Sequence, residues 1–253
     1  GVGLACGLRA VDHATAWRVR GDAGIEAGDG FVQRLAGPDV GRAALMLARQ
    51  RIEQDGIDIV TNIDYACDKA VCDLLGHHFP DDGILTEETY KEGDPIDLAN
   101  CWVIDPLDGT TNYTHGFPYF GVSIAYFLDN RPEVAVVYYP NMDELYLAVR
   151  GGGASLNGQR IETSDVSEWK QSLVATGFPY DVTQNRNNGY LEYFHTMLSH
   201  AQGLRRPGAA ALDLAFLACG RLEGFWEFNL NPWDVAAGIL AVIVGDGHHQ
   251  SWK

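Results

Sequence analysis

The chain has little positive charge. Lys and Arg number 18 against 34 Asp and Glu, so the formal net charge is −16 with His neutral. Nucleic acid is therefore not an expected partner, because proteins bind the phosphate backbone mainly through Lys and Arg. An acidic protein can still act on a phosphorylated substrate, provided that bound cations reverse the local field.

Long apolar runs and cysteine motifs are also lacking. No apolar run approaches the roughly 18 to 20 residues of a membrane helix, and the N-terminal residues lack the continuous apolar stretch of a secretory signal. The five cysteines are scattered, odd in number and without a CxxC pair, which argues against a disulfide framework or a zinc site. We therefore expect a cytoplasmic protein without a membrane partner.

What is present predicts a globular protein of mixed α and β structure. The 253 residues are 46% hydrophobic, which suits one large domain or two small lobes with a substantial core. We expect layers of helix on sheet. The predicted division is an unassigned segment 1–35, an N-terminal α+β lobe over 36–163, and a C-terminal α/β lobe over 164–253 that is shortened at its end.

Periodicity and turn residues predict the individual elements. Helices are expected at 38–54, 65–79, 209–219 and 231–244, and strands at 57–64, 101–105, 120–129, 133–140, 144–150, 172–179 and 223–229. Short turns join the three strands from 120 to 150, as in an antiparallel meander. Residues 151–158, GGGASLNG, are predicted as a glycine-rich loop.

The stretch CWVIDPLDGTTNY, residues 101–113, places two acids at the end of an apolar run. Asp105 and Asp108 flank Pro106 and Leu107, and a plain turn would use the same residue types. The alternative is a ligand site, because open α/β folds bind ligands where a strand ends and a helix begins. Two carboxylates and a carbonyl there would suit Mg²⁺.

Three further acids each have a structural explanation and a chemical one. Glu87 follows a strand as half of an exposed acidic pair, Asp64 could cap the helix after it, and Asp234 occupies the third position of a helix, where an acid favours the dipole. If these acids converge with Asp105 and Asp108, their repulsion raises several pKa values, and divalent cations resolve that conflict.

Two long motifs in order then point to a family. WVIDPLDGTTNYTHGFP and NPWDVAAGI resemble the two signatures of the inositol monophosphatase family of Mg²⁺-dependent, lithium-sensitive phosphatases. DIVTNID, FPDDGILTEE, RGGGASLNG and ATGFPYD match further family segments in the right order. The resemblance covers roughly residues 57–244, and it implies a layered αβαβα sandwich that is usually dimeric.

The resemblance also implies the roles of individual residues. Metal ligands would be Glu87, Asp105, the Leu107 carbonyl, Asp108 and Asp234; catalytic residues would be Glu87, Thr110 and Asp64; substrate contacts would be Asp108, Gly109, Thr110, Ala210, Glu227 and Asp234. Two or three Mg²⁺ per site are implied, with Mn²⁺ able to substitute and Li⁺ and Ca²⁺ inhibitory. The implied reaction is the hydrolysis of inositol monophosphate, or of a related polyol or sugar phosphate, by metal-activated water.

Other functions stay open at this stage. Related family phosphatases act on fructose 1,6-bisphosphate, histidinol phosphate or nucleotide 3′,5′-bisphosphate, and a regulatory family member would keep the fold with weak activity. Ala209 stands where the family usually carries Ser or Thr, which puts one side-chain contact near the substrate in doubt.

Two charged features have no assigned role. Asp213 lies in an apolar helix, so we expect it to have a polar partner. Arg205 and Arg206 precede that helix either as a solvated pair or at the entrance to the pocket.

Overall fold

The computed structural model describes residues 62–178 and 189–245. The predicted helix at 38–54, the unassigned segment 1–35 and the last eight residues of the chain lie outside this part. The elements are α3 Asn62–His78, β1 Gly83–Thr86, β2 Asn100–Asp108, α4 Thr110–Thr114, β3 Gly121–Leu128, β4 Arg131–Tyr139, β5 Glu144–Val149, β6 Gly153–Leu156, β7 Gln159–Ile161, η1 Trp169–Gln171, β8 Leu173–Thr176, α5 Tyr190–His200, β9 Gly203–Arg205, α6 Ala210–Ala218, β10 Gly224–Trp226 and α7 Pro232–Gly245.

Within the described residues, the first sheet contains seven strands in sequence order, β1 to β7. β1 and β2 run parallel, and every later neighbour is antiparallel. The predicted meander of β3, β4 and β5 is therefore confirmed. Alternate residues of these strands point to opposite faces of the sheet, so the sheet can take a helical layer on each side.

Helix α3 covers one face of this sheet. Its buried residues Ile63, Cys67, Val71 and Leu75 recur every fourth position, which places them on one side of a helix. They pack against a group of strand residues that includes Trp102. Helices α6 and α7 cover the opposite face, where small alanines on both helices allow a close approach to the strands.

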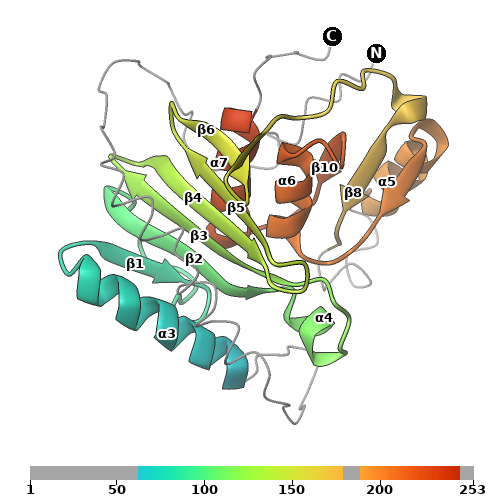
Figure 1. Ribbon diagram of the computed structural model, residues 1–253. Helices are drawn as coiled ribbons and strands as arrows, with labels where there is room; N and C mark the ends of the chain where they lie inside the picture. Colours follow the sequence, from blue (N-terminus) through green and yellow to red (C-terminus); the bar gives the residue numbers. More distant parts are fainter. Residues whose placement is uncertain (1–61, 179–188, 246–253) are drawn as a thin grey trace.

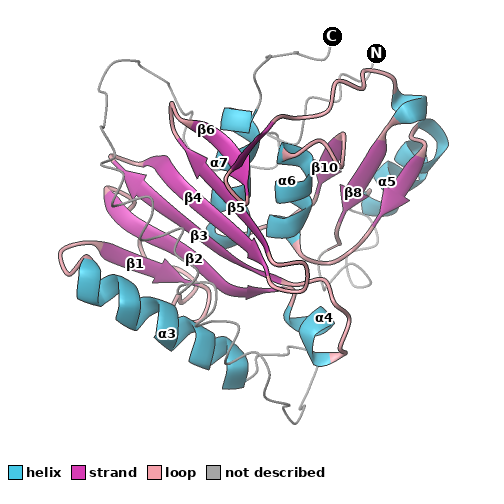
Figure 2. Ribbon diagram, viewed as in Figure 1, coloured by secondary structure: helices cyan, strands magenta, loops and turns pink. Residues whose placement is uncertain are grey.

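The second sheet has three parallel strands in the order β10-β8-β9. Helix α6 lies between the two sheets, and α5 lies on the outer side of the small sheet (Figures 1 and 2). The layers are thus α3, the large sheet, α6 with α7, the small sheet and α5. This order confirms the expected mixed α and β fold with αβαβα layers.

Some local predictions were wrong. Residues 62–64 are helical, although they belong to a stretch predicted as a strand, because Ile63 completes the apolar stripe of α3. The glycine-rich stretch 151–158 contributes β6, in which Ala154 is buried against the core. Helix α5 and strand β9 were not predicted. The division between residues 163 and 164 stays a prediction.

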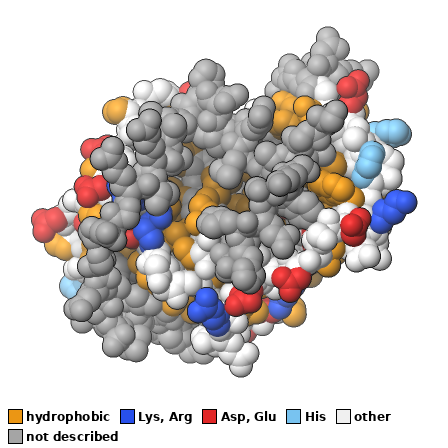
Figure 3. Space-filling view, turned by 90° about the horizontal axis from the view of Figure 1, so that it is seen from above, with side chains coloured by type: hydrophobic (Ala, Val, Ile, Leu, Met, Phe, Trp, Pro, Cys, Tyr) orange, Lys and Arg blue, Asp and Glu red, His pale blue; other side chains and the backbone are white. Residues whose placement is uncertain are grey.

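The surface shows its charges as dispersed groups. On the face shown in Figure 3, the Lys and Arg side chains lie apart from one another, with acidic side chains among them. No helix in residues 62–178 and 189–245 combines the length and the apolar character that crossing a membrane requires.

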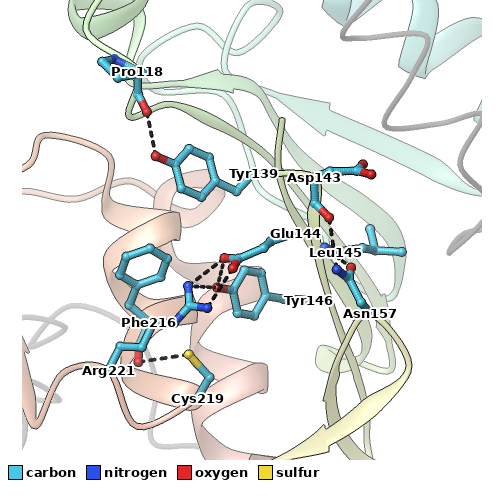
Figure 4. A network of polar contacts seen from close by, with 10 residues as sticks. All are labelled: Pro118, Tyr139, Asp143, Glu144, Leu145, Tyr146, Asn157, Phe216, Cys219 and Arg221. Atoms are coloured by element: carbon cyan, nitrogen blue, oxygen red, sulfur yellow. Dashed lines mark hydrogen bonds and ion pairs between the residues drawn. The ribbon is translucent and has the colours of Figure 1, made fainter. Parts of the chain in front are cut away.

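A partly buried polar network joins the end of α6 to the large sheet (Figure 4). Arg221, just beyond α6, donates to both carboxylate oxygens of Glu144 on β5, with distances of 2.6 and 2.7 Å. Tyr146 donates to the same carboxylate at 2.7 Å, and the guanidinium carbon lies 4.8 Å from the centre of the Phe216 ring. The hydrogen bonds from Arg221 lower the pKa of Glu144. Each charge in this network therefore has its partner within the chain.

Candidate active site

The parallel pairing of β1 and β2 brings Glu87 beside Asp105. Thr86 pairs with Ile104, so the residue that follows each belongs to the same edge of the sheet. The Glu87 amide donates to the Ile104 carbonyl at 3.2 Å, which extends the pairing by one step. Two acids from different strands therefore meet at the carboxyl ends of these strands, where open α/β sheets bind ligands.

A β-bulge lies between Asp105 and Asp108. The plain turn that the sequence also allowed is therefore not formed. β2 continues through both acids, and its register against β3 shifts between Asp105 opposite Ser123 and Asp108 opposite Gly121. Pro106 has no amide proton for the ladder, and the Leu107 amide donates to Asp105 Oδ1 at 3.0 Å. In a regular strand, residues three apart face opposite sides. The one extra residue returns both acids to the same side.

Asp108, at the end of β2, caps helix α6, which lies between the two sheets. Its Oδ2 accepts a hydrogen bond of 2.7 Å from the Ala211 amide in the first turn of α6. Ala209, the N-cap of α6, has no side-chain acceptor of its own, so Asp108 satisfies an amide that the helix leaves unpaired. The same contact places Ala210, the first residue of α6, next to the acid pair.

Gly109 and Asn112 hold this junction together. Gly109 has φ of +93°, and a Cβ on it would lie 3.1 Å from the Tyr119 carbonyl oxygen and 3.3 Å from Ala209 Cβ. The Asn112 side-chain amide donates to the carbonyls of Tyr119 at 2.7 Å and Pro207 at 2.8 Å. A residue with a side chain at position 109 would separate β2 from α6.

Asp234 reaches the site from the first turn of α7. Its Oδ2 accepts a hydrogen bond of 2.6 Å from the Asn231 amide, so it does stabilise the start of the helix, as its position predicted. Ser123 Oγ lies 3.2 Å from the Trp233 carbonyl oxygen and ties the same turn to β3. Capping uses one oxygen of Asp234 and leaves the other for a ligand.

Thr110 and Asp64 form a second pair. Thr110 Oγ1 lies 2.9 Å from Asp64 Oδ1 and 3.1 Å from the Leu107 carbonyl oxygen. Asp64 is 2% exposed and lies in the first turn of α3. It is inside the helix, so the alternative that Asp64 is the N-cap of the following helix is wrong. A hydroxyl that donates its proton to either acceptor presents its lone pairs to a nearby water.

The acids act on one another electrostatically. Burial raises the pKa of Asp105 well above its usual range, and Glu87 and Asp108 raise it further. Burial and then Asp234 raise the pKa of Asp108 to about 8. Burial raises the pKa of Asp234 to about 6. Part of the Glu87 side chain is exposed to solvent. The loss of water around its carboxylate, and then the charge of Asp234, raise its pKa. The four carboxylates therefore share one electrostatic neighbourhood.

The donor chemistry of this group fits a hard divalent cation. All its donors are carboxylate or carbonyl oxygens, which Mg²⁺ prefers. Among residues 62–178 and 189–245, however, no group of three or more His, Cys, Asp or Glu side chains is already arranged to hold a metal ion. Asp105, Asp108 and Asp234 each direct one oxygen to a backbone amide. The tertiary structure thus brings the charges of these acids together.

Glu227 lies just beyond β10, at the edge of the small sheet. Burial raises its pKa to about 7, with Asp234 acting in the same direction. It therefore belongs to the same electrostatic neighbourhood as the predicted metal ligands.

Some residues at the site were not assigned from the sequence. Asn112 lies within the quoted motif, but only the tertiary structure reveals its bonds to the loop before α6. The expected partner of Asp213 is Tyr119, whose hydroxyl donates to Asp213 Oδ1 at 2.7 Å. Tyr119 precedes β3 without any motif of its own, so no sequence signal could have identified it.

Known proteins resemble this chain in both sequence and fold. The model of the inositol monophosphatase family matches residues 32–244. An inositol-1-monophosphatase of Synechocystis is 43% identical over 201 residues, which cover 78% of this chain and 69% of that protein. The Nus factor SuhB of Pseudomonas aeruginosa is 44% identical over 197 residues, covering 77% of this chain and 73% of that protein.

A solved structure agrees with these relatives. The inositol monophosphatase from Anabaena superposes with a TM-score of 0.73 at 40% identity, covering 85% of this chain and 80% of that chain. The family match spans both signature motifs, which contain Asp105, Asp108 and Asp234. This chain therefore belongs to the inositol monophosphatase family.

Proposed function

We propose that this chain is a Mg²⁺-dependent phosphomonoesterase that hydrolyses inositol monophosphate or a related small polyol or sugar phosphate. The observation that carries the proposal is the meeting of Glu87, Asp105, Asp108 and Asp234 with raised pKa values. Buried acids that repel one another cost stability, and such groups cluster at functional sites. Family membership supports the same reaction class.

Glu87, Asp105, the Leu107 carbonyl, Asp108 and Asp234 would hold two or three Mg²⁺. Bound there, Mg²⁺ supplies positive charge for the phosphate and lowers the pKa of water. The chain itself contributes orientation. Asp105 and Asp108 face the same side because of the bulge, and the backbone amides that bond one oxygen of each acid fix its direction.

Thr110 and Asp64 would orient the attacking water. Thr110 Oγ1 donates to Asp64 or to the Leu107 carbonyl, and its lone pairs can then accept a hydrogen bond from water. Glu87, just beyond the neighbouring strand β1, would accept the water proton. The amides of Gly109 and Thr110 would bond to phosphate oxygens, and Ala210, at the start of α6, would be a further substrate contact.

Glu227 would bind the alcohol part of the substrate. Its carboxylate accepts hydrogen bonds, which suits hydroxyl groups and disfavours a second phosphate next to it. This preference supports an inositol or sugar monophosphate over fructose 1,6-bisphosphate or a nucleotide 3′,5′-bisphosphate. Histidinol phosphate has a single phosphate, so the assay below separates it from inositol monophosphate.

A phosphate-release assay with Mg²⁺ tests this function. We expect turnover of inositol monophosphate that disappears with a chelator, returns with Mn²⁺ and is inhibited by Li⁺ and Ca²⁺. Absence of turnover on inositol monophosphate, fructose 1,6-bisphosphate, histidinol phosphate and adenosine 3′,5′-bisphosphate would rule out the phosphatase proposal. Light scattering of the same sample tests the expected homodimer, and cell fractionation tests the expected cytoplasmic location.

A second candidate is a regulatory protein that keeps the fold and acts through a partner with weak catalysis. The relative named Nus factor SuhB, at 44% identity, favours it. The two candidates differ in turnover: a regulatory protein would release phosphate slowly from every substrate in the assay. All five acids expected of a catalyst are present, which favours the enzyme.

A further inference from the structure

The small sheet brings two opposite charges to one edge. β10, β8 and β9 are parallel, with Trp226 opposite Thr176 and Arg205 opposite Ala175. The residues that follow the strands therefore lie at the same carboxyl edge, where α/β folds bind ligands. Glu227 follows β10, Gly177 follows β8 and Arg206 follows β9.

Gly177 lets Glu227 lean across the middle strand. A Cβ built on Gly177 would overlap the Glu227 carboxylate, so that carboxylate occupies the place where a side chain of the central strand would stand. The acid thus extends from β10 toward β9. Electrostatics agree with this placement, since burial and Asp234 raise the pKa of Glu227 and the positive charge of Arg206 opposes them.

Arg206 differs from the arginine next to it. Arg205 Nη1 donates to the Leu204 carbonyl at 2.9 Å and lies 3.4 Å from the place of a Cβ on Gly203, so it folds back along β9. Arg206 is exposed, and no ion pair within the described ranges includes Arg206 or Glu227. Both groups are thus able to bond to a ligand.

We propose that Arg206 is a specificity-determining residue that, together with Glu227, selects the alcohol part of the substrate. This inference rests on the proposed phosphatase function. A hydroxyl group both donates and accepts hydrogen bonds, so adjacent hydroxyls of a polyol phosphate match a carboxylate acceptor beside a guanidinium donor. The two opposite charges sum to zero, which suits an uncharged polyol ring. A leaving group without further hydroxyls would leave both Arg206 and Glu227 unpaired.

The test compares two substrates and two arginine variants. Inositol 1-phosphate carries hydroxyls on its leaving group, whereas p-nitrophenyl phosphate carries none. Arg206→Gln should raise KM for inositol 1-phosphate about tenfold, change kcat by less than about twofold, and leave p-nitrophenyl phosphate hydrolysis unchanged. Arg205→Gln removes the same charge one residue away and should leave the ratio of the two kcat/KM values unchanged.

Arg206→Lys should recover part of the selectivity, because it keeps the charge and a donor. The proposal is overturned if Arg206→Gln affects both substrates equally, or if Arg205→Gln produces the same change in ratio. Wild-type protein that hydrolyses neither substrate overturns the proposed function and this inference with it. Wild-type turnover with unaltered selectivity in Arg206→Gln overturns only the inference.

Discussion

Two clusters of polar side chains in this molecule are built in opposite ways. In the Glu144 network, Arg221 and Tyr146 satisfy the carboxylate, and the pKa of Glu144 falls. In the acid cluster, Asp105 and Asp108 meet further acids, and their pKa values rise. A satisfied network stabilises a fold, whereas an unbalanced one stores repulsion that a bound ligand can relieve. The contrast separates a structural role from a functional one.

The largest effect is expected from Asp108→Asn. Asparagine keeps an acceptor for the Ala211 amide but removes one charge from the proposed ligand set, so kcat/KM should fall by at least roughly 10²-fold. The melting temperature in chelator should stay the same or rise, because repulsion is reduced. Steady-state kinetics and thermal unfolding measure both effects.

Asp81→Asn is the matched control, because Asp81 is exposed before β1, at the opposite end of that strand. Asp81→Asn should change neither kcat/KM nor the melting temperature. An Asp108→Asn protein with wild-type turnover would show that the site has been assigned incorrectly.

A smaller loss is expected from Thr110→Val. The variant loses the hydroxyl beside Asp64, and without that group to orient water kcat should fall roughly 10²-fold while KM changes little. Thr110→Ser keeps the hydroxyl and should retain most activity. Thr111→Val, one residue along, is the control for a general effect on α4, and an equal loss there would contradict the role given to Thr110.

The third prediction concerns the stability of the acid cluster as a function of pH. Unfolded acids titrate near about pH 4, whereas the folded pKa values of Asp234 and Asp108 are about 6 and about 8. A raised folded pKa means that stability is present at low pH and is lost as pH rises through the folded values. With chelator, the melting temperature should fall on the order of 5 °C between pH 5 and pH 8.

Added Mg²⁺ should reduce this fall, because it binds the ionised form of the folded chain. Superimposable curves with Mg²⁺ and with chelator would argue against a cation at the cluster. Glu144 has the opposite sign: its lowered pKa contributes stability above about pH 4 that disappears on further acidification.

The smallest effect is expected from Arg221→Met. The variant leaves the Glu144 carboxylate without its charged donor, and the free energy of unfolding should drop by about 1–3 kcal/mol with kcat/KM unchanged. Urea unfolding measures the loss. The exposed pair Arg160–Glu162 is the control, since Arg160→Met should cost less than about 0.5 kcal/mol. A loss of activity in Arg221→Met would contradict the purely structural role given to the Glu144 network.

Local patterns predicted most elements because their causes are local. Strand-like runs joined by short turns predicted the meander of β3 to β5, and apolar residues at helical spacing predicted α6 and α7. The bulge in β2 was missed because it depends on the register against β3, which the residues from Asp105 to Asp108 do not encode by themselves. Helix α5 was not predicted, although Tyr190, Phe194 and Met197 recur at helical spacing; most of its other residues are exposed.

The sequence by itself determined the chemistry available to this protein: oxygen donors gathered in two motifs, an excess of acids, and the order of elements that carries them. Only the tertiary structure decided which groups meet. Asp108 reaches an amide 103 positions away, and Arg221 reaches a carboxylate 77 positions away. Such contacts carry no spacing pattern, because strand register and helix packing, which depend on the whole core, set the distance between residues so far apart.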